Sequence, residues 1–84
     1  MKIHNIPTAD LIFGVPRTPK WWAERPEHRK VFEGIRESIK TKGLEKPLEV
    51  TRANIGLVVD VGNQRLQALL DLGITNAPCI IKGD

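Results

Sequence analysis

Two segments of the chain carry apolar side chains at the three- and four-residue spacing of a helix. In the longer segment they are Val31, Phe32, Ile35 and Ile39, and in the shorter one Leu66, Leu69 and Leu70. A proline suits the first turn of the longer segment and a glycine follows its last turn, so the pattern predicts a helix over residues 26–42. The shorter pattern predicts a helix over residues 64–72, which a second glycine ends.

Other segments have the apolar pattern of strands. Residues 46–52 alternate polar and apolar side chains, and a turn at residues 53–56 leads into the apolar residues 57–61. These two segments are therefore expected to form an antiparallel pair. Further short strands are expected at residues 3–6, 11–13 and 78–82. The pattern as a whole predicts an α+β fold, with a small mixed sheet and two main helices.

The length and the cysteine content of the chain limit the number of domains and the cellular location that we expect. Eighty-four residues suffice for one small domain, so residues 1–84 are expected to form a single unit. Cys79 is the only cysteine, which rules out an internal disulfide and favours a reducing, cytoplasmic location. Between Pro78 and Ile80, it is expected to be a small buried apolar residue. The sequence shows no spacing typical of a zinc site and no apolar run of membrane-spanning length.

The excess positive charge gathers in one segment that also holds both tryptophans. Residues 17–30 contain five basic and two acidic side chains, and the rest of the chain is balanced. Residues 14–25 contain a glycine and two prolines and are predicted to form a loop. The candidate contact residues for nucleic acid or an acidic protein surface are Arg17, Lys20, Trp21, Trp22 and Arg25. The alternative interpretation is a solvated loop whose tryptophans pack on the body of the domain.

The residues that follow the apolar run 57–61 have the composition of an anion site. Gly62 allows a ligand to approach the backbone closely, and the helix behind it begins with Asn63, Gln64 and Arg65. The first turn of a helix presents unpaired N–H groups and the positive end of the helix dipole. An arginine there adds a fork of donors that suits phosphate oxygens. These residues therefore form the candidate phosphate site.

Asp60 and Arg65 each leave two interpretations open. Arg65 binds phosphate, or it pairs with a carboxylate such as that of Asp60. Asp60 holds a magnesium ion beside a phosphate, or it pairs locally. Each interpretation predicts a different partner for the carboxylate.

Several short motifs follow one another along the chain, namely Ser38-Ile39, Gly43-Leu44, Pro47-Leu48 with Val50, and Gly62 and Arg65 with Ala68. Their order and spacing resemble those of the ParB/sulfiredoxin family over nearly the whole chain. The resemblance implies a fold that holds a nucleotide, CTP in ParB-like proteins and ATP or ADP in sulfiredoxins and free-serine kinases, with Mg²⁺ as a candidate companion. It also implies that the phosphates lie against Gly62 to Arg65 and that Gly43 and Pro47 shape the pocket.

The chain departs from the family pattern at two positions. Sulfiredoxins have their catalytic cysteine where this chain has Asn63, and an amide cannot act as a thiolate nucleophile, so the chain is not expected to be a sulfiredoxin. ParB proteins have a glutamate and an arginine at the positions of Asn63 and Gln64, and the serine kinases have histidines there. Neither residue of this chain is a good general base, so we expect nucleotide binding rather than catalysis.

The resulting hypothesis is a stand-alone ParB-like nucleotide-binding module that is associated with DNA and encoded by a phage or mobile element. We expect neither the helix-turn-helix nor the dimerisation domain of ParB proper. One alternative is a protein-interaction module that uses Trp21, Trp22 and the basic loop. Another is a small enzyme, either a nucleotide hydrolase, a phosphotransferase or a nuclease.

Overall fold

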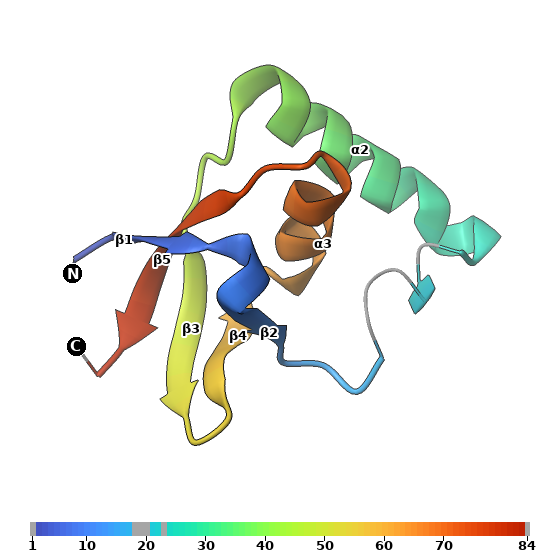
Figure 1. Cartoon of the computed structure of the whole chain (residues 1–84). Helices are drawn as coiled ribbons and strands as arrows, with labels where there is room; N and C mark the ends of the chain where they lie inside the picture. The colour runs from blue at the N-terminus through green and yellow to red at the C-terminus, as the bar shows by residue number, and fades with distance from the viewer. Residues whose placement is uncertain (1, 18–20, 23, 84) are drawn as a thin grey trace.

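The chain forms one mixed sheet covered by helices. The computed structural model describes residues 2–17, 21–22 and 24–83. Within these residues the elements are β1 (His4–Pro7), the 3₁₀ helix η1 (Thr8–Asp10), β2 (Leu11–Phe13), α2 (Pro26–Lys42), β3 (Leu48–Ala53), β4 (Gly56–Val61), α3 (Asn63–Asp71) and β5 (Asn76–Lys82), as shown in Figure 1. This arrangement confirms the predicted α+β class.

The five strands lie in the order β1-β5-β3-β4-β2. β3 and β4 form the predicted antiparallel pair, in which Arg52 lies opposite Leu57. β5 runs parallel to β3 and antiparallel to β1, and β2 runs parallel to β4 at the edge of the sheet. Because β2 and β4 are parallel neighbours, the turn that follows β4 lies beside the segment that begins at Gly14 after β2.

The hydrophobic core lies between the sheet and α3. Its largest fully buried side chains are Leu48, Leu66, Leu69, Val50, Val59 and Cys79. α2 packs across α3 and adds Ile39 to the same core, so that α3 lies between α2 and the sheet (Figure 1). The burial of Cys79 confirms that it is a small core residue and not an accessible thiol.

The element boundaries follow the predictions with small shifts. α2 covers the predicted residues 26–42. α3 begins at Asn63 rather than at residue 64, because the carbonyl of Gly62 already accepts the N–H of Leu66 at 2.8 Å. β3 begins after Pro47, which has no N–H to donate to a neighbouring strand. β5 begins at Asn76 rather than at residue 78, because β1 pairs with it from that residue onward.

The predicted loop over residues 14–25 falls partly outside the described residues, and within it Trp21 and Trp22 are helical rather than loop residues. Lys20, a candidate contact residue, is one of the residues that the structure does not describe. Over the described ranges, no helix is both long enough and apolar enough to cross a membrane.

Candidate functional site

Gly62 fixes the turn between β4 and α3. Its φ of 103° and ψ of 21° lie in the left-handed region, which residues with a side chain rarely adopt. A Cβ on this residue would also lie 2.5 Å from Cδ2 of Leu48, a side chain with no exposed surface. The chain therefore turns tightly here, and the unpaired N–H groups of the first turn of α3 come directly after the end of β4.

Asn63 connects this turn to the segment after β2. The residue is 9% exposed, and its side chain bonds only to backbone groups among the described residues. Oδ1 accepts the N–H of Gly14 at 2.9 Å, and Nδ2 donates to the carbonyl of Val59 at 3.0 Å. Gly14 lies so near β4 that a Cβ on it would overlap the Val59 carbonyl oxygen. The Asn63 amide thus holds two segments together, whereas the side chain of Gln64 is exposed.

Arg65 stands on the first turn of α3 with a half-buried side chain. Among the described residues, its guanidinium has no ion pair or hydrogen bond. The suggested pair with Asp60 is not formed. The Asp60 carboxylate instead accepts a hydrogen bond from Oγ1 of Thr51 and lies 3.7 Å from Nζ of Lys82. Asp60 therefore pairs locally, and Arg65 keeps its donors available for a ligand.

A pocket of about 400 Å³ opens at this end of α3. We call it the first pocket, and Val15, Ile35 and residues 62–65 line it. Ile35 belongs to α2, and Val15 follows Gly14, whose N–H is held by Asn63. The four predicted phosphate residues therefore share one cavity, which has apolar side chains on its other walls.

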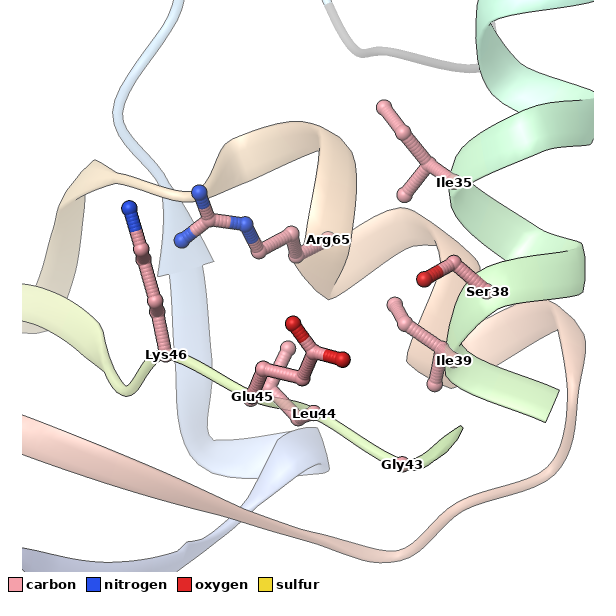
Figure 2. A pocket seen from close by; sticks show the side chains of 8 residues that line it. All are labelled: Ile35, Ser38, Ile39, Gly43, Leu44, Glu45, Lys46 and Arg65. Carbon is pink, nitrogen blue, oxygen red and sulfur yellow. The ribbon is translucent and has the colours of Figure 1, made fainter. Parts of the chain in front are cut away.

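A second pocket, of about 210 Å³, adjoins the first, since Ile35 and Arg65 line both. It lies between the C-terminal turns of α2 and the segment that leads into β3 (Figure 2). Ser38 and Glu45 point into the pocket, and the cationic ends of Lys46 and Arg65 point toward the same side of it (Figure 2). A single ligand that passes Arg65 can therefore occupy both pockets.

Solved structures of other proteins share this architecture, although no family model and no curated protein matches the sequence. A sulfiredoxin from Arabidopsis thaliana matches with a TM-score of 0.75 at 19% identity, over 100% of this chain and 88% of its own. C-terminally truncated ParB from Caulobacter crescentus, complexed with CTP-γ-S, gives a TM-score of 0.77 at 20% identity, over 98% of this chain. A variant of free serine kinase in complex with ADP gives 0.75 at 19% identity, over 99% of this chain. The chain has a ParB/sulfiredoxin-like fold.

The ParB/sulfiredoxin-like fold accounts for the whole chain but for only part of two of these relatives. The chain spans 44% of the ParB structure and 32% of the serine kinase structure. The match confirms the fold predicted from the sequence. At identities of 19% and 20%, the shared property is the fold itself.

Within this ParB/sulfiredoxin-like fold, sequence reasoning did not identify all the pocket residues. Gly43, expected to shape the pocket, lines the second pocket, and Pro47 directly follows the lining residue Lys46. Ser38 and Glu45 also line it but are not predicted site residues. The available signal was the position of Ser38 next to the apolar stripe of its helix, which places it near the buried face.

A second candidate surface lies at the start of α2 and in the segment before it. We call it the basic aromatic cluster, and it consists of Arg17, Trp21, Trp22, Arg25 and His28. The Cζ atoms of Arg25 and Arg17 lie 3.6 Å and 4.2 Å from the centre of the Trp21 ring. The Trp22 ring packs edge-on against Trp21 at 4.9 Å and against His28 at 5.1 Å. These contacts bring together the predicted contact residues that the structure describes, and Trp22 is 41% exposed.

Proposed function

We propose that this chain is a nucleotide-binding module whose phosphate site is the turn from Gly62 to Arg65. The observation that carries the proposal is the position of Arg65. Its guanidinium stands at the positive end of α3, beside a pocket of about 400 Å³, and is unpaired among the described residues. A half-buried arginine without a carboxylate partner favours an anionic ligand at that place.

The ligands of the similar structures support a nucleotide. ParB from Caulobacter crescentus is complexed with CTP-γ-S, and free serine kinase with AMP or with ADP. We propose CTP or ATP, together with Mg²⁺ on its phosphates, as the ligand class of this chain. Asp60 is not part of the proposal, because its carboxylate bonds to Thr51 and Lys82 within the sheet.

Each residue of the proposed phosphate site has a different role in binding. Gly62 lets a phosphate approach the backbone, and the N–H groups at the start of α3 donate to its oxygens. Asn63 contributes through its backbone, since both polar atoms of its side chain already bond to other backbone groups. Arg65 supplies the charge-assisted hydrogen bonds, and Lys46 adds a second positive charge nearby.

We propose binding without turnover. The position of the sulfiredoxin cysteine is occupied by Asn63, and Cys79 is fully buried, so neither supplies an accessible thiolate. Gln64, on the same turn, is an amide and not a general base.

The proposal is tested by calorimetric titration of the purified chain with CTP, ATP, cytidine and adenosine in the presence of Mg²⁺. The triphosphates should bind at least about tenfold more tightly than the nucleosides, because only they engage the phosphate site. Phosphate release, followed in the same samples, should stay at the level without protein. Absence of binding by every ribonucleoside triphosphate would overturn the proposal, and protein-dependent phosphate release would favour the hydrolase alternative.

A second candidate function is an interaction module, which the basic aromatic cluster favours. Stacking on Trp21 holds Arg17 and Arg25 in place, so their remaining donors are pre-organised for phosphates or carboxylates. A nucleic acid or an acidic protein surface is the corresponding partner class. Titration with duplex DNA at rising salt concentration tests the nucleic-acid partner. If the basic aromatic cluster binds DNA, the affinity should fall steeply as salt is added, because each neutralised phosphate releases bound counterions.

A further inference from the structure

Glu45 places a carboxylate in the second pocket. Figure 2 shows its side chain pointing into the space between Arg65 and Ser38, and the pocket walls behind it are apolar. Within the described part of the chain, Glu45 has no ion pair or hydrogen bond, although Lys46 is its neighbour. An acidic group beside the proposed phosphate site repels the phosphates, and a contact between the carboxylate and another part of the ligand would offset that repulsion.

The space formed by the two pockets has a positively charged region at Lys46 and Arg65 and a separate region that contains the carboxylate of Glu45. The cationic ends of Lys46 and Arg65 lie toward one side of the second pocket, and Arg65 is also part of the first pocket. Glu45 and Ser38 lie on the side of α2, with Ile35, Ile39 and Leu44 as apolar walls. If the phosphates lie at Arg65, the end of the ligand that enters the second pocket meets an acceptor, a hydroxyl group and apolar surfaces. A nucleobase combines these properties, because it has polar edges and apolar faces.

We propose that Glu45 reads the base of the nucleotide and selects bases that present an exocyclic amino group, such as cytosine and adenine. The inference rests on the proposed nucleotide-binding function. An ionised carboxylate is an acceptor only, so it pairs with an amino N–H, as glutamate and aspartate do with the amino group of cytosine. Uracil and hypoxanthine carry a carbonyl oxygen at the same position. That oxygen would face the carboxylate with lone pair against lone pair.

The test compares ligands that differ only at this group and in the proton on the adjacent ring nitrogen. Calorimetric titration with CTP against UTP, and with ATP against ITP, keeps the sugar and the phosphates constant. The wild-type chain should bind each amino-bearing triphosphate about tenfold or more tightly than its oxo counterpart, the effect expected of one charge-assisted hydrogen bond. Glu45→Gln should bring both ratios close to one, because an amide side chain both accepts and donates.

Glu33→Gln is the matched control, since Glu33 is exposed on α2 and the substitution removes the same charge. It should leave both ratios as in the wild type. Equal binding of CTP and UTP by the wild type, or ratios that survive Glu45→Gln, would overturn the role of Glu45 while leaving the phosphate site standing. Failure of all four triphosphates to bind would remove the phosphate site and this inference together.

Discussion

The side chain of Asn63 accepts the backbone N–H of Gly14 at 2.9 Å, across 49 positions of sequence. With its second bond, to the carbonyl of Val59, it joins the end of β2, the end of β4 and the first turn of α3. Val15, which follows Gly14, lines the first pocket opposite the phosphate residues. The side chain of Asn63 thus has a structural role in this chain.

Asn63→Ala should destabilise the fold by about 2 kcal/mol, because it leaves the part-buried N–H of Gly14 and the buried carbonyl of Val59 without their side-chain partner. Chemical denaturation gives this free energy of unfolding. Asn5→Ala, at an exposed position of β1, is the control and should change stability by less than about 0.5 kcal/mol. Equal effects of the two substitutions would show that the amide bridge contributes nothing.

Gly62→Ala and Gly34→Ala should change stability in opposite directions. At Gly62 an added Cβ meets both a left-handed backbone and Cδ2 of Leu48 at 2.5 Å, so alanine should cost more than about 1 kcal/mol. At Gly34, within α2, an added Cβ would meet no heavy atom within 4 Å beyond its chain neighbours and the nearby backbone of its own helix, and alanine should stabilise by roughly 0.5–1 kcal/mol. Thermal denaturation of the two variants measures both. A neutral Gly62→Ala would contradict the assigned turn geometry.

The local elements were predictable, because their signals lie within a few residues of one another. The apolar stripe of α2 and the proline at its start define residues 26–42 without reference to the rest of the chain. The 3₁₀ helix at residues 8–10 was not predictable, because the hydrogen bonds that hold it come from residues far away in the sequence. The hydroxyl of Thr8 donates to the carbonyl of Ile74 at 2.9 Å, and its N–H donates to the carbonyl of Thr75 at 2.9 Å.

The same distinction applies to the candidate site. The residues from Gly62 to Arg65 are contiguous, so their chemistry was readable directly from the sequence. Glu45 and Val15 enter the two pockets from segments whose meeting depends on how α2 packs across α3 and on the bridge from Asn63. The spacing of residues along the sequence does not indicate how these elements pack, so Glu45 and Val15 could not be predicted as pocket residues.

Cys79 should make the stability of the fold fall at alkaline pH. Burial raises the pKa of its thiol above the ordinary value, since desolvation disfavours the thiolate. The unfolded chain therefore loses this proton at a lower pH than the folded chain. The contribution of the Cys79 thiol to the free energy of unfolding is fully present below the pKa of a thiol in the unfolded chain, about 8.5, and is lost as the pH rises above that value.

Denaturation of the wild type and of Cys79→Ala at neutral and alkaline pH isolates this effect, because all other titrating groups are shared. The difference in stability between the two proteins should shrink as the pH rises. A difference that stays constant with pH would mean that the thiol titrates equally in both states.

Replacement of both Trp21 and Trp22 with alanine should leave the fold intact. Their ring contacts include Arg17, Arg25 and His28 of the same segment, and neither tryptophan belongs to the core cluster of the described residues. Far-UV circular dichroism should be unchanged, and nucleotide affinity should stay within about twofold, since Arg65 is untouched. Loss of the far-UV signal would instead assign the tryptophans to the core and remove the interaction surface.

The most direct test of the phosphate site is the dissociation constant for CTP or ATP of Arg65→Ala against that of the wild type, measured by calorimetry with Mg²⁺. Loss of a charge-assisted phosphate contact should weaken binding by about 10- to 100-fold with little change in the melting temperature. Arg29→Ala, an exposed arginine of α2, removes the same charge and should bind as the wild type does. Unchanged affinity in Arg65→Ala, or equal losses in both variants, would contradict a phosphate site at the start of α3.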